Sequence, residues 1–348
     1  MQNEKELIDL KNLEYEELIE FLTSLGEKKF RAEQIFSWLL KGVTSYDEMT
    51  NISKETKNKL NEVSFVSYMK IKQKLVSKID GTVKYLFELN DGNCIESVVM
   101  RYHHGITICV SSQVGCRMGC KFCASTIGGL YRNLSAGEIL NQIIFAQKDL
   151  GERIGNIVMM GIGEPMDNYD NVITFLHNVN NEKGLNIGYR HITISTCGIV
   201  NGILKLADEG LPVNLAISLH APNDEIRDAI MPVNKAFKIN ELLNACEEYF
   251  IKTKRRISFE YSLIGGVNDS EENARELAKL ILPLKAHINL IPVNKVEESG
   301  FKKGSQSEIN RFLNLLTKQG VNATIRRELG SDISASCGQL RKKTLKEG

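Results

Sequence analysis

From Ile106 onward, the chain alternates short runs of β-branched residues with longer helical segments. Predicted helices such as SAGEILNQIIFAQKDLG and SEENARELAKLILPL lie between the runs. This alternation is typical of a parallel sheet covered by helices. About six repeats favour a barrel over a doubly wound sheet, so we predict an α/β fold built on a partial (β/α)6, TIM-like barrel. The runs that we expect to form strands are ITICVSS, NIVMMGIG, HITISTCG, NLAISLHA, RISFEYSLI, HINLIPVN and NATIRREL.

The part of the chain before the barrel divides into two regions by pattern. Residues 1–65 read as short amphipathic helices, because EYEELIEFLTSLG and FRAEQIFSWLLKG each end in a glycine that can cap a helix. Residues 66–104 contain strand-like runs with Asp-Gly pairs at Asp80 and Asp91, which indicate hairpin turns. We therefore predict a helical accessory module over 1–65, a β-hairpin extension over 66–104 and the barrel over 105–348.

Composition places the chain among ordinary globular proteins, with 42% hydrophobic and 25% charged residues. No apolar run approaches the ~20 residues that a membrane span needs, and MQNEKELIDL lacks the pattern of a signal peptide. We therefore expect a cytoplasmic protein with no membrane partner. In that reducing compartment the eight cysteines are better explained as metal ligands, reactive thiols or buried core residues than as disulfides.

The most specific motif is GCRMGCKFCAS, in which three cysteines fall within eight residues and no fourth lies nearby. A structural zinc site takes four ligands, which His103 and His104 could complete. An iron-sulfur cluster bound by three thiolates leaves one iron open, and Gly115 and Gly119 would let the loop wrap it closely. The spacing favours the cluster over buried structural thiols. The three candidate ligands are Cys116, Cys120 and Cys123.

Polar or glycine-rich residues follow four of the predicted strands. In a barrel, groups at the carboxyl ends of the strands gather at one rim, where the functional site forms. Each ending alone is explained by a turn or a helix cap, but four endings at one rim favour a shared ligand. The endings contain Gly163 and Glu164, Ser195, the run Ser218–Leu219–His220, and Asn294.

The net charge of +1 gives no sign of a nucleic-acid partner. Any such sign must come from local clusters of basic residues. Lys70, Lys72 and Lys74 alternate with other residues, which on a strand would place all three on one face. Further basic clusters occur at 252–256 and 341–346. The helical module is a candidate RNA-binding unit, but the chain up to Glu62 has an acidic balance of charge. We therefore expect phosphate contacts to come from the Lys70 strand and the later basic clusters.

The motif Cys-x3-Cys-x2-Cys, with Phe122 before the last cysteine, resembles the radical S-adenosylmethionine (SAM) superfamily. Longer segments resemble one family within it, RlmN, the dual-specificity adenine methyltransferases of 23S rRNA and tRNA. These segments are SSQVGCRMGCKFCAS, MGIGEPMDNYDNV, LAISLHAPNDEIRDAIMPVN, FEYSLIGGVNDS, NLIPVN and CGQL. The resemblance spans nearly the whole chain.

The resemblance implies a barrel of the radical SAM type, a 4Fe-4S cluster and S-adenosyl-L-methionine as a second cofactor. It implies methylation of carbon 2 of one 23S rRNA adenosine, at the peptidyl transferase centre, and of the adenosine 3′ to the anticodon in tRNA. Two SAM molecules would be used per turnover. The implied partners are these RNAs and an electron donor such as flavodoxin, and the implied state is a monomer.

The resemblance also assigns roles to single residues. Cys337 in SASCGQL matches the cysteine that carries the methyl group, and Cys109 in TICVSS matches its partner in a transient disulfide. Glu96 in CIESVVM matches the proton acceptor. The other cysteines outside the motif match no catalytic position and are expected to be structural. The residues implied for SAM binding are Gly163, Glu164, Ser195, Ser218, Leu219, His220 and Asn294.

Three other functions remain open at this point. The sister family Cfr uses the same cluster and paired cysteines to methylate carbon 8 of the same rRNA adenine. A non-catalytic iron-sulfur protein that carries electrons or binds RNA would explain the cysteines and the basic clusters. A radical enzyme acting on a small molecule is the third alternative.

Overall fold

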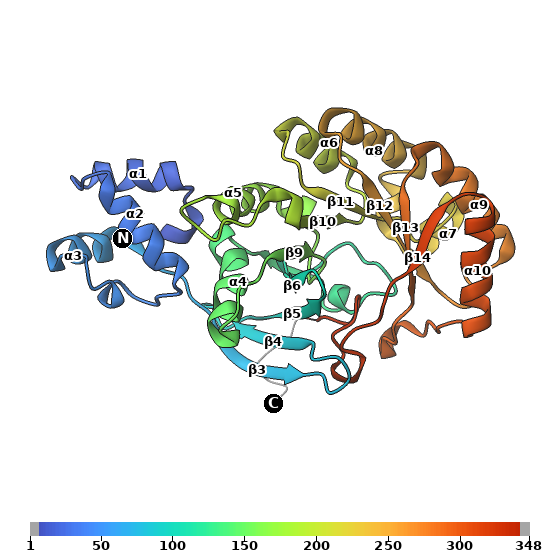
Figure 1. The fold of residues 1–348 in the computed structure, drawn as a ribbon, viewed down its shortest axis with the longest axis horizontal. Coiled ribbons are helices and arrows are strands. Elements are labelled where there is room, and N and C mark those ends of the chain that lie inside the picture. Colours follow the sequence, from blue (N-terminus) through green and yellow to red (C-terminus); the bar gives the residue numbers. More distant parts are fainter. Residues whose placement is uncertain (1–6, 342–348) are drawn as a thin grey trace, which may run out of the picture.

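The computed structural model describes residues 7–341, and a ten-stranded sheet forms its centre (Figure 1). The strand order is β14-β13-β12-β11-β10-β9-β6-β5-β4-β3. All seven strands predicted from the sequence are present, and they pair in parallel with one another. They are β6 (Gly105–Cys109), β9 (Asn156–Met159), β10 (Ile192–Thr196), β11 (Asn214–Ser218), β12 (Ile257–Leu263), β13 (His287–Pro292) and β14 (Asn322–Ile325).

Helices connect each parallel strand to the next and cover the outer face of the sheet (Figure 1). Apolar side chains of these helices and strands form one continuous buried core. Six strand–helix units are followed by β14, so the prediction of a (β/α)6 barrel is confirmed. The helices are α4 (Ala136–Leu150), α5 (Tyr169–Asn180), α6 (Val200–Glu209), α7 (Asp224–Ile230), α8 (Ile239–Thr253), α9 (Glu271–Ile281) and α10 (Gln306–Lys318).

The predicted hairpin region is confirmed as three antiparallel strands that continue the barrel sheet beyond β6. They are β3 (Lys70–Val76), β4 (Val83–Glu88) and β5 (Cys94–Tyr102). Gly81 and Gly92 in the two turns have φ values of 73° and 79°, which glycine adopts without strain. Because β3 and β14 end the strand order, the sheet is open rather than closed into a full barrel.

The expectation that Lys70, Lys72 and Lys74 share one face is wrong. The β3–β4 register shifts between Ile71 and Gln73, so Lys70 pairs with Glu88 whereas Lys74 pairs with Tyr85. Side chains at 85 and 88 point to opposite faces of β4, and the bulge therefore separates the lysines. Lys72 forms an ion pair with Glu88 at 3.2 Å, and Lys74 forms one with Asp149 at 2.5 Å.

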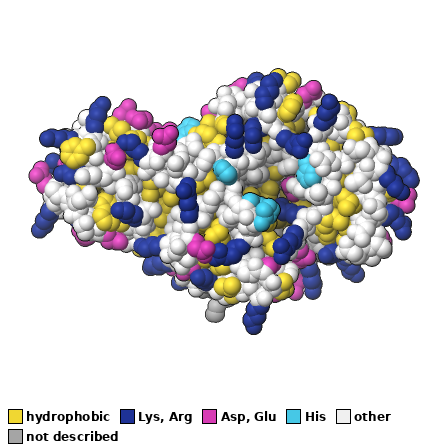
Figure 2. Space-filling model, viewed as in Figure 1, with side chains coloured by type: hydrophobic (Ala, Val, Ile, Leu, Met, Phe, Trp, Pro, Cys, Tyr) yellow, Lys and Arg dark blue, Asp and Glu magenta, His cyan; other side chains and the backbone are white. Residues whose placement is uncertain are grey.

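Basic side chains do not gather elsewhere on the face shown in Figure 2. Lys and Arg side chains are spread over this face and its outline. In the cluster at 252–256, Lys252 forms an ion pair with Asp208 at 2.6 Å. The cluster at 341–346 lies outside the described residues apart from Arg341.

The N-terminal helices form a separate packing unit beside the barrel (Figure 1). Its elements are β1 (Ile8–Asp9), α1 (Tyr15–Ser24), α2 (Phe30–Leu40), α3 (Lys54–Val63) and β2 (Ser64–Phe65). Leu18, Ile35 and Leu60 belong to its own buried core. The division of the chain at 65/66 and 104/105 stays a prediction.

The segment at residues 11–12 of this unit packs closely against helix α4. The Lys11 ammonium donates to the Asn141 side-chain oxygen at 2.7 Å, and the Gly137 N–H donates to Asn12 Oδ1 at 2.8 Å. A Cβ at Gly137 would lie 2.7 Å from Lys11 Cβ, so only glycine permits this approach. Within residues 7–341, no helix has the length and apolar content to cross a membrane.

Candidate active site

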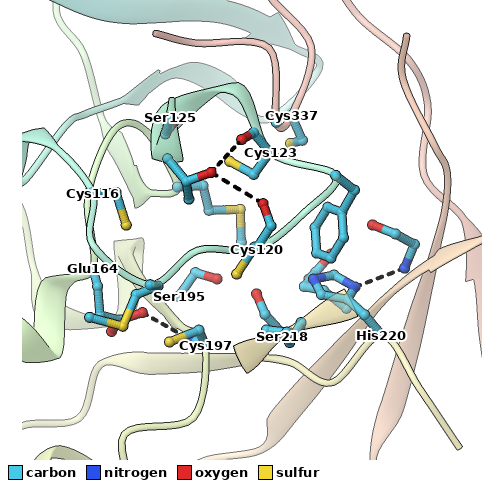
Figure 3. A pocket seen from close by; sticks show the side chains of 18 of the residues that line it. Cys116, Cys120, Cys123, Ser125, Glu164, Ser195, Cys197, Ser218, His220 and Cys337 are labelled. Carbon is cyan, nitrogen blue, oxygen red and sulfur yellow. Dashed lines mark hydrogen bonds between the residues drawn. The ribbon is translucent and has the colours of Figure 1, made fainter. Parts of the chain in front are cut away.

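A pocket lies at the carboxyl ends of the parallel strands, where the sequence predicted a functional rim. Figure 3 shows the cysteine loop above it, Glu164, Ser195, Ser218 and His220 below, and Cys337 beside Cys123. The structure thus brings four strand endings, the cysteine motif and the C-terminal loop to one place. Residues implied by the resemblance that line the pocket are Cys116, Cys120, Cys123, Gly163, Glu164, Ser195, Ser218, His220, Asn294 and Cys337.

The cysteine motif forms a tight loop after β7 (Gln113–Gly115). Gly115 has φ 81°, and a Cβ there would lie 2.0 Å from the Gly129 carbonyl oxygen, so the loop requires glycine at this position. Burial, followed by nearby acidic groups including the Cys123 thiolate, raises the pKa of Cys116 to about 12, although a hydrogen bond from the Met118 backbone opposes this. Burial and the two neighbouring thiolates also raise the pKa of Cys120. The thiols are therefore neutral unless a cation binds them.

The zinc alternative receives no support from the geometry. His103 and His104 precede the amino end of β6, whereas the cysteine loop follows its carboxyl end. The histidines therefore lie at the opposite ends of the strands from the cysteines. In the part of the chain that the structure describes, no three His, Cys, Asp or Glu side chains are placed to bind a single metal ion.

Glu164 is fixed by backbone N–H groups at the base of the pocket. One carboxylate oxygen accepts the Met166 N–H at 3.0 Å, and the other accepts the Cys197 N–H at 2.7 Å. Burial raises the pKa of Glu164, although these hydrogen bonds have the opposite effect and lower it. Gly163 has φ 108°, and a Cβ there would lie 2.6 Å from Gln113 Cβ, so the preceding turn also requires glycine.

The ends of β10 and β11 are joined by the buried Arg227 of α7. Its guanidinium donates to the carbonyl oxygens of Cys197 at 2.6 Å and Leu219 at 3.1 Å. Leu219 is itself fully buried and does not line the pocket. Cys197, which sequence reasoning treated as structural, lines the pocket beside Ser195.

His220 is a neutral acceptor in the pocket wall. Its Nδ1 accepts the Ser262 N–H at 2.8 Å, and its ring packs edge-on against Phe122 with 4.8 Å between centroids. Burial and the nearby Arg227 charge lower the pKa of His220 to about 3. The imidazole is therefore uncharged at neutral pH.

Cys337 lies on a loop, residues 330–341, that follows β14; this segment is called the Cys337 loop below. Asn294 Nδ2 donates to the Cys337 carbonyl oxygen at 2.9 Å, and the Ala124 N–H donates to the Gly338 oxygen at 2.8 Å. Ser125 Oγ donates to the Leu340 oxygen at 2.7 Å. The loop is thus anchored to both the cysteine motif and the end of β13.

Cys109 lies behind Cys337 at the end of β6. It is buried in an apolar cluster with Ala335 and Leu340, which flank Cys337 in the Cys337 loop. Burial and the adjacent Cys337 raise the pKa of Cys109 to about 12, and Arg326 opposes this effect. Both cysteines are free thiols.

Glu96 is not among the residues that line the pocket. It lies on β5 under the Cys337 loop, where its Oε2 accepts the Arg341 N–H at 3.0 Å. The cavity that it lines also contains Lys84 and Ser334. The Cys337 loop contributes residues to both the pocket and this cavity.

Sequence reasoning missed two charged side chains in the pocket, Arg326 and Glu260. The Arg326 Nη1 lies 3.5 Å from Glu260 Oε2 and 3.3 Å from Met160 Sδ. The nearby Cys337 thiolate raises the pKa of Arg326. Arg326 follows β14 directly, but it falls inside the run NATIRREL that was predicted as strand, so the sequence did not mark it as a residue of the rim.

Two protein-family models match the chain. The radical SAM superfamily model matches residues 110–278. The model of the ribosomal RNA large subunit methyltransferase N-terminal domain matches residues 8–66. The first match covers the cysteine motif and the barrel from β9 through β12, and the second covers the helical module.

Curated relatives match over almost the full length. A probable dual-specificity RNA methyltransferase RlmN from Alkaliphilus oremlandii is 58% identical, with 98% of this chain and 99% of the relative covered. The protein of the same name from Clostridioides difficile is 55% identical, with 98% and 99% covered. A crystal structure of a radical SAM methyltransferase from Sphaerobacter thermophilus superposes with a TM-score of 0.91 at 43% identity, over 96% of this chain and 99% of the other.

Proposed function

The chain belongs to the RlmN family of radical SAM RNA methyltransferases, and we propose that it methylates carbon 2 of adenosine in two RNAs. One target is a specific adenosine of 23S rRNA at the peptidyl transferase centre, and the other is the adenosine 3′ to the anticodon in tRNA. One observation carries the proposal: a single pocket contains Cys337 together with the three cysteines of the motif.

The residues of the pocket fit a 4Fe-4S cluster and SAM. Three thiols on one glycine-containing loop are a donor set for a cluster with one open iron. Next to them, Glu164, Ser195 and Asn294 offer carboxylate, hydroxyl and amide groups of the kind that bind an amino acid and a ribose. When bound, the two cofactors would supply a primary carbon radical able to abstract a hydrogen atom.

A thiol that carries the methyl group is needed because carbon 2 of adenine is a poor nucleophile. Carbon 2 of adenine lies between two ring nitrogens and is electron-poor, so it cannot attack a sulfonium methyl group. A cysteine thiolate can, because deprotonated sulfur is a strong nucleophile. Cys337 would therefore take the methyl group first, lose a hydrogen atom from it, and then bond through that carbon to the base.

Two further residues would complete the reaction. Glu96 would accept the proton from carbon 2. Because Glu96 lines a different cavity and accepts the Arg341 N–H of the Cys337 loop, this transfer would require the loop to move. Cys109 would then attack the Cys337 sulfur, so that a disulfide forms and the carbon–sulfur bond to the RNA breaks. The freed carbon would take a proton to become the methyl group, and the surplus electron would pass to a one-electron acceptor such as the cluster that the three motif cysteines would hold. The packing of Cys109 against Ala335 supports this pairing.

The test replaces Cys337 with alanine and compares it with Cys246→Ala, which alters a buried thiol in α8. We expect Cys337→Ala to abolish RNA methylation while the purified chain still assembles its cluster, measured by iron content and absorbance. Cys246→Ala should retain methylation. Methylation by the Cys337→Ala chain would contradict the carrier-thiol route.

The site of methylation is decided by the product. Digestion of treated rRNA and tRNA followed by mass analysis should give 2-methyladenosine, and 8-methyladenosine would instead indicate the reaction of the Cfr family. If no SAM is cleaved to 5′-deoxyadenosine when RNA is present, the result would favour a non-catalytic iron-sulfur protein. Because the proposed substrates are RNAs, we propose that the enzyme acts in the cytoplasm. We also propose that it is a monomer and that it receives electrons from a donor such as flavodoxin.

A further inference from the structure

A buried ion pair links the proposed proton acceptor to the Cys337 loop. Lys84 and Glu96 lie diagonally across the β4–β5 ladder, because Lys84 pairs with Val98 and Glu96 pairs with Leu86. Long side chains reach one another at such diagonal positions. The Lys84 Nζ lies 3.3 Å from Glu96 Oε1, and their side chains are only 8% and 2% exposed.

The same ammonium group also contacts the loop. Lys84 Nζ donates to the Ser334 carbonyl oxygen at 3.0 Å, three residues before Cys337. On its other oxygen, Glu96 accepts the Arg341 N–H at 3.0 Å. Lys84 and Glu96 therefore contact the Cys337 loop on either side of Cys337.

We propose that Lys84 is a positioning residue that maintains Glu96 as an oriented carboxylate for proton transfer from the RNA adduct. This inference rests on the proposed function. A carboxylate on a side chain that is 2% exposed is stable in its charged form only with a cation or hydrogen-bond donors beside it. The charged neighbours that line this cavity are Lys84, Asp332, Lys295 and Arg341, and Lys84 forms a side-chain ion pair with Glu96.

The proton transfer that Lys84 would support is balanced within these groups. The bond between carbon 2 and hydrogen breaks, its electron pair stays on the adduct, and the proton bonds to a Glu96 oxygen. Glu96 becomes a neutral carboxylic acid. Lys84 remains an ammonium group, so the charge beside the Glu96 carboxyl group is unchanged when the proton arrives.

The experiment compares four variants of the full chain with reconstituted cluster on a 23S rRNA fragment. Lys84→Met removes the charge and keeps the length of the side chain, and Lys84→Arg keeps the charge. Asp80→Ala removes a different anchor of the Cys337 loop, the hydrogen bond from the Gly330 N–H at 2.9 Å, without touching Glu96. Glu96→Gln removes the proposed acceptor itself.

We expect Lys84→Met to form 5′-deoxyadenosine at the parent rate while the covalent protein–RNA adduct resolves at least about tenfold more slowly, within the range of general-base effects. Adduct would then accumulate on a denaturing gel. Lys84→Arg should restore resolution, and Asp80→Ala should not accumulate adduct. Equal accumulation in Lys84→Met and Asp80→Ala, or parent-like resolution in Lys84→Met, would overturn the inference.

Glu96→Gln separates this inference from the function on which it rests. Adduct in Glu96→Gln without adduct in Lys84→Met would refute the role of Lys84 alone. Absence of adduct in Glu96→Gln would refute the role of Glu96 as proton acceptor. If Lys84→Met does not assemble its cluster, Lys84→Gln and Lys84→Arg are compared instead, and equal resolution by these two would refute the need for a charge.

Discussion

Asp80 in the β3–β4 turn anchors the start of the Cys337 loop, and its removal should loosen that loop. The Asp80 carboxylate accepts the Gly330 N–H at 2.9 Å and, through its other oxygen, the Thr82 N–H at 3.0 Å. In return, the Lys78 N–H of the same turn donates to Asp332 of the loop at 2.9 Å. We therefore expect Asp80→Ala to release the Gly330 end of the loop.

The size of the effect follows from the pKa of Asp80. Partial burial would raise this pKa, but hydrogen bonds from Thr82, Gly330 and Ser77 outweigh burial and lower it from 3.8 to about 2. A shift of nearly two units corresponds to roughly 2.5 kcal/mol shared among these donors. After allowance for solvent screening, the Gly330 bond contributes about 1 kcal/mol, or about a fivefold change in loop opening.

Amide hydrogen exchange with mass detection measures that opening. The N–H groups of Ala335 and Arg341 are hydrogen-bonded in the closed loop, and they should exchange about fivefold faster in Asp80→Ala. Asp91→Ala is the matched control, because Asp91 occupies the other hairpin turn and contacts Arg132 and Asn93 rather than the loop. Loop exchange should stay at the parent rate in that variant.

The same anchor should weaken in acid. Because the pKa of Asp80 is lower in the folded state, its stabilising effect is complete above pH 3.8 and is lost as the pH falls toward 2. Loop exchange in Asp80→Ala that stays within twofold of the parent above pH 5 would refute the reasoning, provided that exchange in the β3–β4 turn itself increases.

Three further predictions concern stability. Arg227→Met leaves two buried carbonyl oxygens without a donor and should lower the free energy of unfolding by about 3 kcal/mol, measured by urea denaturation with circular dichroism. Gly137→Ala places a Cβ 2.7 Å from Lys11 Cβ and should cost about 1–3 kcal/mol, with the fluorescence of Trp38 reporting release of the helical unit. Because the pKa of His220 is lowered from 6.5 to about 3, stability should fall by up to ~1.4 kcal/mol per pH unit below pH 6.5, and His220→Gln should reduce this slope.

The barrel was predictable because its strands are short β-branched runs separated by helical segments. Periodicity within each run is local information, and it identified all seven parallel strands. The rim followed from topology, since carboxyl ends of parallel strands meet at one edge. This is why Glu164, Ser195, His220 and Asn294 line one pocket although they are far apart in the sequence.

Features that depend on pairing between distant segments were not predictable. The bulge in β3 depends on how that strand pairs with β4, and it separates lysines that alternate regularly in the sequence. Lys84 has no local signal, because its importance comes from Glu96 on the next strand and Ser334 some 250 positions later. The sequence of a short segment does not reveal which distant residues will pair with it.

The order in which the pocket is assembled follows from the position of the Cys337 loop in the chain. Its contacts join residues 215 positions apart, from Ser125 to Leu340, and 250 positions apart, from Asp80 to Gly330. Such distant contacts form late, because a long segment must be closed before they stabilise anything. During synthesis the cysteine motif would leave the ribosome long before Cys337 does. The chain could therefore receive its cluster before it has the thiol that makes a radical useful.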